Sequence, residues 1–381
     1  MRIEFVATLA KVEATAWDHL VSDACPLVSH AYLAGLEVHR CLSGHGWHPT
    51  HALAYDGSRL VGALPLYLRD NSYGEFVFDW AWAEAFQKAG GRYYPKLVTA
   101  VPFTPSAGPR LLIDPTADNA EAEAIATHLI DAAIGLAAGN KLSSWHCLFP
   151  DSAQIPHFTR PDLILREGCQ YHWYNQGYPS FDEFLGTLNS KRRKEIKRER
   201  RDVAAQNLIF EIVEGPDITA AHWATFYQFY CDTFDRKWGA PRLTEEFFNY
   251  LSGCPTALPV LFLARDADGY VAGAFAVRGK DALYGRHWGC NRYVKFLHFE
   301  LCFYQTIDYC IQRGIRHLDA GAQGEHKIPR GFIAQKTWSV HWINDPGFRR
   351  AVADFCHREQ HQIERYIDAV DDHSAYREKD G

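Results

Sequence analysis

A short segment near residue 320 gathers side chains that could transfer protons and bind anions. His317–Asp319 has the pattern of a short strand following a helix that ends at Gly314, and Gly321 and Gly324 then interrupt the strand. The polar side chains that emerge there are Gln323, Glu325, His326, Lys327 and Arg330. A base, an acid, an amide and cations at the end of a strand are typical of an enzyme site. The spacing alone fits a polar surface loop equally well.

A second chemical feature is the basic segment of residues 190–203. Ser180 and Glu183 have the spacing of a capping box and predict a short helix before it. Cations then cover most of the circumference of the next predicted helix, among them Arg192, Arg193 and Lys194. A solvated helix face is the alternative, but there are too few acids to pair with these cations. We therefore expect an anion site, with phosphates of a cofactor or of RNA as its ligands.

A third feature is the aromatic block of residues 72–82, followed by Tyr93, Tyr94 and Lys96. Dense aromatics with glycine and proline fit an irregular wall of a cleft, and they fit plain core packing equally. Two carboxylates, Glu75 and Asp79, stand among these rings, where an acid is either exposed or used. We predict that Glu75, Asp79 and Tyr94 contribute to substrate binding.

Histidine and cysteine spacing gives little support for a metal. His45, His48 and His51 are separated by glycine and proline, which prevents one helix from presenting them together. Cys356, His357 and His361 lie in a predicted helix, where exposed histidines are far commoner than ligands. We therefore predict no metal site.

The composition limits the class of protein. The chain has 381 residues, of which 47% are hydrophobic and 23% charged, so it can form two domains with real cores. Its net charge of −6 confines any nucleic-acid contact to a local patch. The ten cysteines form no CxxC pair and are expected to be reduced thiols. Without a signal peptide or a long apolar run, we expect a cytoplasmic protein with no integral membrane contact.

The elements that must position these residues occur twice along the chain. A hairpin is predicted at residues 52–68, turning at Asp56–Gly57, with a strand at 111–113, a helix at 119–138 and a strand at 144–149. The second half repeats this order with a hairpin at 260–277, a strand at 282–288, a helix at 297–313 and a strand at 316–319. Two copies of one α+β unit explain this order best.

Several blocks resemble the bacterial Fem-like, FemAB-related N-acyltransferase family. They are Ser72–Ala83, Tyr93–Leu97, Val101–Pro105, Asn189–Arg200 and Gly321–Lys327, in the family's order and over nearly the whole chain. The resemblance implies an α+β fold of tandem GNAT-like domains, each a mixed twisted sheet flanked by helices. We assign these to residues 1–165 and 166–345, with a helical tail at 346–381. The resemblance also implies a relationship to transferases that take amino acids from aminoacyl-tRNA and attach them to peptidoglycan precursors.

Acyl transfer to an amine assigns roles to these residues. The acceptor must lose a proton, charge on the carbonyl oxygen must be stabilised, and the reactants must be held together. We expect His326 or Glu325 as the base, assisted or oriented by Glu300 and Asp319. Backbone N–H groups near Trp288 would stabilise the oxyanion, and Lys327 and Arg330 would bind phosphate or carboxylate. Covalent catalysis by Cys290 or Cys302 is disfavoured, because an apolar setting raises the pKa of a thiol and leaves less of the nucleophilic thiolate.

The donor and the class of activity stay open at this stage. The run Arg286–Asn291 departs from the pyrophosphate loop of acetyl-CoA-using GNAT domains, because Asn291 stands where glycine or alanine is wanted. No heptad pattern is long enough for the coiled-coil arm of some Fem transferases. We expect no tightly bound cofactor, acyl-CoA or aminoacyl-tRNA as the donor, and a small-molecule or peptide amine as the acceptor. The alternative is a binding protein that recognises a peptide or cell-wall fragment without turnover.

Overall fold

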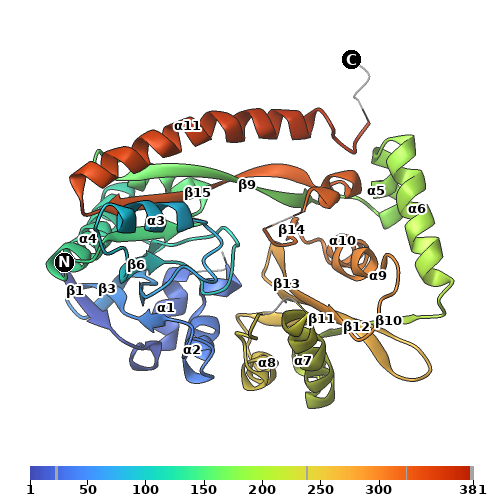
Figure 1. Cartoon of the computed structure of the whole chain (residues 1–381). Helices are drawn as coiled ribbons and strands as arrows, with labels where there is room; N and C mark the ends of the chain where they lie inside the picture. The colour runs from blue at the N-terminus through green and yellow to red at the C-terminus, as the bar shows by residue number, and fades with distance from the viewer. Residues whose placement is uncertain (22–24, 237–238, 323, 378–381) are drawn as a thin grey trace. The chain divides into compact units, whose positions relative to one another are not determined.

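The computed structural model describes residues 1–21, 25–236, 239–322 and 324–377 (Figure 1). The chain divides into unit 1, Met1–Cys169 with Lys336–Tyr366, and unit 2, Gln170–Gln335 with Ile367–Gly381. These bounds differ from the domains assigned from the sequence. The difference arises because most of strand β15 (Ile333–Ile343) and of helix α11 (Pro346–Asp371) belongs to unit 1.

Unit 1 contains strands from two sheets. The first sheet has the order β1-β3-β4-β7, formed by β1 (Arg2–Val6), β3 (His51–Asp56), β4 (Arg59–Leu64) and β7 (Leu112–Ile113). The second has the order β15-β8-β6-β5-β2 within the unit, with β8 (Ser144–Leu148), β6 (Lys96–Thr99), β5 (Tyr67–Arg69) and β2 (Trp47–Pro49). The predicted β3–β4 hairpin is present, and Gly57 takes the positive φ of 59° that its tight turn requires.

Helix α4 (Asn119–Gly139) supplies much of the core of unit 1. Asp118 caps it, together with Glu121, in a capping box. Its buried Ile125 and Leu129 belong to one hydrophobic cluster with residues of β3, β4 and β8. Among the described helices, α4 alone has the length and hydropathy that a membrane span requires, a test that core helices also pass. The other helices are α1 (Ala14–Val21), α2 (His30–Val38) and α3 (Trp80–Lys88), with 3₁₀ turns at Leu9–Lys11, Pro26–Val28 and Ser152–Phe158.

The strands of unit 2 have the order β10-β11-β12-β13-β14-β9. They are β10 (Ile209–Glu214), β11 (Leu258–Arg265), β12 (Tyr270–Arg278), β13 (Ala282–Cys290), β14 (His317–Asp319) and β9 (Ile164–Tyr174), which begins in unit 1. Neighbours pair antiparallel except β13 with β14, which are parallel. The predicted hairpin is β11–β12.

Helices cover both faces of the unit 2 sheet. Figure 1 shows α7 (Ala220–Asp235) and α8 (Glu245–Leu251) on one side of β11–β13, and α9 (Leu297–Phe299) and α10 (Gln305–Arg313) on the other. A π-helical segment, Glu300–Tyr304, joins α9 to α10, and Gly314 ends α10 with a φ of 65°. The remaining elements are α5 (Phe181–Thr187), α6 (Ser190–Ala204), a 3₁₀ turn at Gly215–Asp217 and the 3₁₀ segment η6 (Glu325–Arg330).

The two hairpins share one packing feature. Gly62 of β4 and Gly273 of β12 each lie against a helix, because an added Cβ would lie 2.4 Å from Ile125 of α4 and 3.1 Å from Phe226 of α7, respectively. A glycine in the second strand of each hairpin therefore lets a helix approach closely. The predicted α+β class, with mixed sheets flanked by helices, is confirmed.

Candidate functional site

A cavity of about 220 Å³ lies in unit 2, between the β13–β14 strand pair and the helical segment that follows β13. Three residues predicted for the site line it: Trp288, His326 and Lys327. The other side chains are mainly apolar or aromatic, and they include Phe262, His298, Cys302, Phe303 and Thr306. Ligand sites commonly combine such a lining with a few polar groups. The volume lies below the roughly 300–1,000 Å³ of drug-sized sites, so the cavity suits a small chemical group.

The cavity exists because two neighbouring strands separate. β13 and β14 pair only from Ala282 to Tyr284, and β14 then ends at Asp319. β13 continues, with a bulge at Arg286 in its pairing with β12. Its backbone from Gly285 to Trp288 lines the cavity instead of a neighbouring strand. The expected N–H donors near Trp288 therefore lie in the part of β13 that borders the cavity.

Lys327 is the buried cation of the cavity. Lys327 belongs to the η6 segment and is 1% exposed. Its Nζ donates a hydrogen bond to the carbonyl oxygen of Gly321 at 2.5 Å. Burial lowers its pKa to about 8, although Asp319 and Cys302 oppose that shift. A lysine with this pKa exists in both protonation states near neutral pH, so it can accept or donate a proton.

His326 lies at the exposed edge of the same cavity. Its ring stacks on Phe299, with centroids 5.7 Å apart, and Phe303 lies at 5.6 Å. Gly324 is required beside it, because a Cβ there would lie 2.2 Å from the imidazole and the backbone φ is 119°. Burial and the neighbouring Lys327 lower the pKa of His326, so the ring is neutral near neutral pH.

The three predicted carboxylates lie around the cavity but not in its lining. Glu325 is exposed at the start of η6. Glu300 is buried and accepts from Arg200 at 3.1 Å and from the amide of Gln305 at 2.8 Å. Asp319 is buried and accepts from the N–H of Gly321 at 2.9 Å. Asp319 thus acts on Lys327 through its charge and through the loop that both residues contact.

Arg330 has an internal partner in place of a ligand. Its guanidinium donates to both carboxylate oxygens of Glu199 at 2.8 Å, and its Nε donates to the hydroxyl of Tyr304 at 2.9 Å. It also stacks over Phe299 at 3.6 Å. This arrangement ties η6 to helix α6, so Arg330 supports the cavity wall. Gln323, also predicted for the site, lies outside the described residues.

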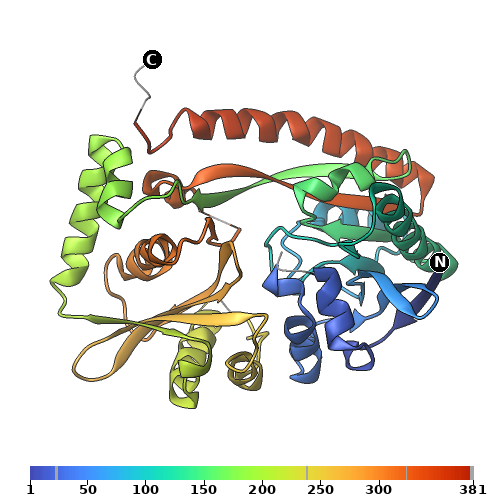
Figure 2. The ribbon, with the colours of Figure 1, turned by 180° about the vertical axis from the view of Figure 1, so that it is seen from behind.

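Helix α6 lies at the surface of unit 2 beside α5 (Figures 1 and 2). Of the three cations singled out in its sequence, Arg192 pairs with Glu195 at 2.8 Å, Arg193 is half-buried and Lys194 is exposed. The exposed cations fall at intervals of three and four residues and form one stripe, namely Lys191, Lys194, Lys197, Arg198 and Arg201. The exposed cationic face of α6 therefore includes Lys194, whereas Arg192 and Arg193 are partly buried.

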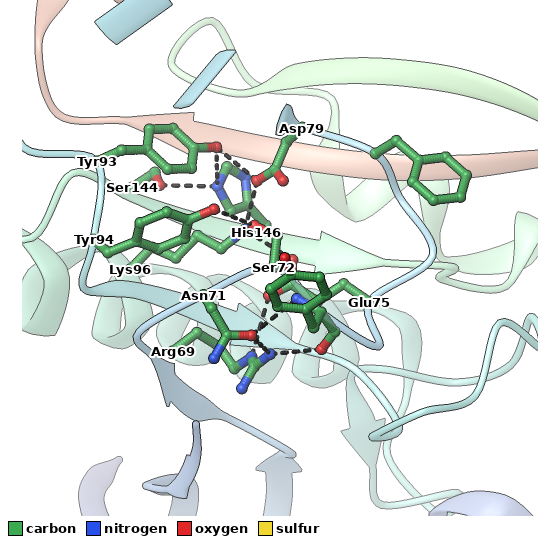
Figure 3. Close-up of polar contacts among 12 residues, drawn as sticks. Arg69, Asn71, Ser72, Glu75, Asp79, Tyr93, Tyr94, Lys96, Ser144 and His146 are labelled. Carbon is green, nitrogen blue, oxygen red and sulfur yellow. Dashed lines mark hydrogen bonds and ion pairs between the residues drawn. The ribbon is translucent and has the colours of Figure 1, made fainter. Parts of the chain in front are cut away.

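The aromatic block of unit 1 contains a buried polar network (Figure 3). Lys96 donates to Glu75 at 2.7 Å and to Asp79 at 2.5 Å, and the hydroxyl of Tyr94 lies 2.8 Å from that of Ser72. Burial alone would raise the pKa of Asp79, but Lys96, His146 and Ser72 together lower it to about 2. Glu75 and Asp79 thus both bind Lys96.

The network continues to a pair of histidines on adjacent strands. His146 of β8 and His341 of β15 are paired in register, with their Nδ1 atoms 2.6 Å apart. The hydroxyl of Tyr93 donates to Asp79 and lies 3.3 Å from the imidazole of His146. Burial lowers the pKa of both imidazoles, that of His146 to about 3, so the two rings contact each other and the neighbouring hydroxyls in the neutral form.

Several important residues have no signal in the sequence. His298 and Phe303 line the cavity from the helical side, beside Cys302, and no local motif marks them. Lys96 follows an aromatic block, and the sequence does not reveal its buried carboxylate partners. Glu199 was detectable, because it shares a helical face with Ile196 and Val203 and an acid on an apolar face requires a partner.

The described residues contain no group of three or more histidine, cysteine or acidic side chains placed to hold a metal ion. His48 and His51, considered as ligands, contact separate carboxylates, Asp70 and Glu37. These are two separate histidine–carboxylate contacts.

Comparison with known proteins identifies the family. Residues 8–378 match the FemAB-like family, described as peptidoglycan biosynthesis/recognition. The comparison of the sequence with curated proteins found no match.

Solved structures show the same fold at low sequence identity. The crystal structure of FemX is 11% identical, with 92% of this chain and 99% of that chain covered and a TM-score of 0.55. A conserved protein of unknown function from Bacteroides thetaiotaomicron is 12% identical, with coverages of 90% and 100% and a TM-score of 0.53. The C-terminal domain of a putative lysylphosphatidylglycerol synthetase from Agrobacterium fabrum is 10% identical, with coverages of 91% and 94% and a TM-score of 0.51. Because the family match spans nearly the whole sequence, this chain belongs to the FemAB-like family.

Proposed function

We propose that this protein transfers an aminoacyl or acyl group to the amine of a peptidoglycan precursor. The observation that carries the proposal is Lys327, a buried amine with a pKa of about 8 at a cavity sized for a small group. Membership of a peptidoglycan biosynthesis family supports the pathway. The likeness to FemX supports the fold alone.

Proton transfer in this scheme centres on Lys327. The neutral amine of Lys327 takes a proton from the acceptor ammonium, and the freed amine attacks the carbonyl carbon of the donor. A C–N bond forms and the bond from the carbonyl to its carrier oxygen or sulfur breaks. The second N–H proton passes to the leaving carrier, and Lys327 releases its own proton to solvent. His326, a neutral imidazole at the cavity edge, is the alternative base.

The backbone of β13 would stabilise the developing oxyanion. Gly285 to Trp288 border the cavity in a stretch where β14 no longer pairs with β13, and N–H groups of such a stretch suit a growing negative charge. The apolar walls, with Phe303 and Phe262 among them, lower the local dielectric and strengthen those contacts.

We infer that the donor is an aminoacyl-tRNA. The cavity accommodates the acyl end and leaves the carrier outside, and the stripe on α6 supplies five exposed cations for the phosphates of a large polyanion. A cytoplasmic location fits this donor and the ten free cysteines.

Acyl-CoA is the weaker donor candidate. The run Arg286–Asn291, which falls where a pyrophosphate loop is expected, lies almost wholly inside strand β13. Its Gly289 is used for packing, because an added Cβ would lie 2.1 Å from the carbonyl oxygen of Phe229 in α7. A glycine used in this way does not present its backbone to a phosphate.

An acyl-transfer assay tests the proposal. Purified protein would be incubated with charged tRNA or, separately, with acetyl-CoA, and with a UDP-linked muropeptide acceptor, and products would be identified by mass spectrometry. We expect transfer from charged tRNA, and a loss of about 10²–10⁴-fold in Lys327→Met. Lys295→Met, an exposed lysine outside the cavity, is the matched control and should retain full activity.

Two results would contradict the proposal. Consumption of no donor, with retained binding of the muropeptide, would favour a binding protein without turnover. Full activity of Lys327→Met with loss in His326→Ala would move the base to His326.

A further inference from the structure

Residues 72–80 of unit 1 reverse the usual arrangement of polar and apolar side chains. Ser72, Glu75 and Asp79 are buried, with exposures of 4%, 3% and 2%. The large aromatics of the same segment point outward, with exposures of 64% for Tyr73, 57% for Phe78 and 40% for Trp80. In an ordinary loop the aromatic side chains are the anchors and the carboxylates face water. Here the carboxylates are the anchors.

Three inward-facing cations hold the segment in place. Lys96 of β6 donates to Ser72 and to both carboxylates, as the dashed lines in Figure 3 show. Arg69 at the end of β5 donates to Glu75 at 3.1 Å and to the carbonyl of Tyr73 at 2.8 Å. Arg166 of β9 donates to the carbonyl of Phe78 at 3.0 Å. These three cations therefore hold the segment from its buried side, and the exposed aromatic rings do not take part in those contacts.

This construction is costly for folding alone. Burying charges carries a desolvation penalty, and apolar packing of similar volume is often as stable or more stable. The outward aromatics contribute little to the core, yet their positions are set by those charges. Tyr73 and Trp80 form one ring pair, with centroids 4.8 Å apart and planes inclined by 56°. Aromatic side chains have only two rotatable bonds, so exposed rings bind ligands at a low cost in conformational entropy.

The charge around the rings indicates the kind of ligand. No lysine, arginine or histidine occurs between Asp70 and Trp80, and the cations beneath are committed to carboxylates and carbonyls. The exposed ionisable residues at the start of this segment are Asp70 and His48, whose side chains lie 3.6 Å apart. A carboxylate in contact with an imidazole does not form the cluster of free cations that phosphates require, but its oxygens accept hydrogen bonds from hydroxyl groups. The C–H face of a sugar ring packs on an aromatic ring while its hydroxyls bind such an acceptor.

We propose that Tyr73 and Trp80 form a binding surface for an uncharged pyranose ring of a cell-wall glycan. The cell-wall origin of the glycan rests on the proposed function, while the aromatic surface itself does not. Ser72, Glu75 and Asp79 act as positioning residues, because they hold the loop and do not touch the sugar.

Binding of a defined oligosaccharide tests this surface. The full chain would be titrated with an N-acetylglucosamine tetrasaccharide in the absence of any donor, with calorimetry and saturation-transfer NMR as readouts. We expect Trp80→Ala and Tyr73→Ala each to weaken binding about tenfold. Tyr293→Ala removes an aromatic that is 86% exposed in unit 2, and it should leave the dissociation constant unchanged. Circular dichroism would verify that the variants fold.

Three outcomes would overturn the inference. They are equal affinity in wild type and Trp80→Ala, binding of an RNA oligomer in place of the sugar with the same sensitivity to Trp80→Ala, and dimerisation that Trp80→Ala abolishes in a protein that binds no sugar. The binding experiment contains no donor. A failure of the separate acyl-transfer assay would therefore contradict the proposed function without contradicting sugar binding at Tyr73 and Trp80.

Discussion

Two buried lysines show how the two units use the same side chain differently. Lys96 in unit 1 is 0% exposed and Lys327 in unit 2 is 1% exposed. Lys96 lies between two carboxylates, which raise its pKa above the ordinary value although burial alone would lower it. Lys327 donates to a backbone carbonyl, and burial lowers its pKa to about 8.

The difference lies in the charge that surrounds each ammonium. With two carboxylates in contact, Lys96 stays protonated and serves as a structural tie. With the backbone carbonyl of Gly321 as its hydrogen-bond acceptor, Lys327 titrates near neutral pH and is available for proton transfer. The same contrast separates the other cations, since those of the unit 1 network face inward and those of the α6 stripe face solvent.

The largest effect is expected from removing the structural lysine. Lys96→Met would leave Asp79 buried without its cation and Glu75 with Arg69 alone, which costs about 3–5 kcal/mol of unfolding free energy. Thermal denaturation should show a fall in Tm of roughly 6–20 °C, judged by the size of the unit. Lys327→Met is the matched comparison, because it removes a buried ammonium without a carboxylate in contact and should leave Tm unchanged or raised. Equal losses in the two variants would break the comparison.

The second test is the pH dependence of the two lysines. If neutral Lys327 is the base, kcat/KM should rise with pH and level off above pH 8. The pKa of Lys327 in the folded chain lies below the ~10.4 of an unfolded lysine, so its contribution to stability should increase between pH 8 and that value.

Asp319→Asn sharpens this test. Removing the negative charge destabilises the ammonium of Lys327, so the pH profile should shift to lower pH with the same shape. A profile that does not move would show that Lys327 is not the titrating group. The control is Lys96, whose raised pKa should leave no trace in the activity profile below pH 10.

The smallest effect concerns the outward-facing cations. The triple charge reversal Lys191→Glu, Lys194→Glu and Arg198→Glu should reduce the salt dependence of tRNA binding by about two to three units of the log–log slope. Filter binding at several salt concentrations measures this slope. Reversal of Lys11, Lys88 and Lys141, exposed lysines of unit 1, makes the same change in net charge and should leave the slope intact. Equal slopes for the two triple variants would exclude α6 as the tRNA surface.

Local patterns predicted much of the fold. The hairpins at β3–β4 and β11–β12, the cap of α5 at Ser180, the end of α10 at Gly314 and the full length of α6 follow from turn residues, caps and periodicity. The π-helical segment after α9 was not predicted. No local signal distinguishes it from an ordinary helix, because it depends on how Glu300 and Tyr304 meet α6 and η6.

The candidate site was predictable in part. The glycine-flanked segment led to His326 and Lys327, and both line the cavity. The roles of the surrounding charges were not predictable, because an ionisable side chain in a sequence does not reveal its partner. The sequence predicts Arg330 as an anion ligand, but in the structure it pairs with Glu199, which is 131 residues away in the chain. The sequence predicts Glu75 and Asp79 as substrate ligands, but in the structure both pair with Lys96.

By itself, the sequence determined the α+β class, the repeated order of elements, the family resemblance and the segment that supplies His326 and Lys327 to the cavity. These properties depend on interactions between residues close together in the chain, such as turns, caps and amphipathic periodicity. The tertiary structure decided which lysine is a structural tie, which lysine titrates, and which aromatics face solvent. Those properties depend on burial and on charges brought together from distant segments, and the free energy of a charge depends on its surroundings far more than on its neighbours in sequence.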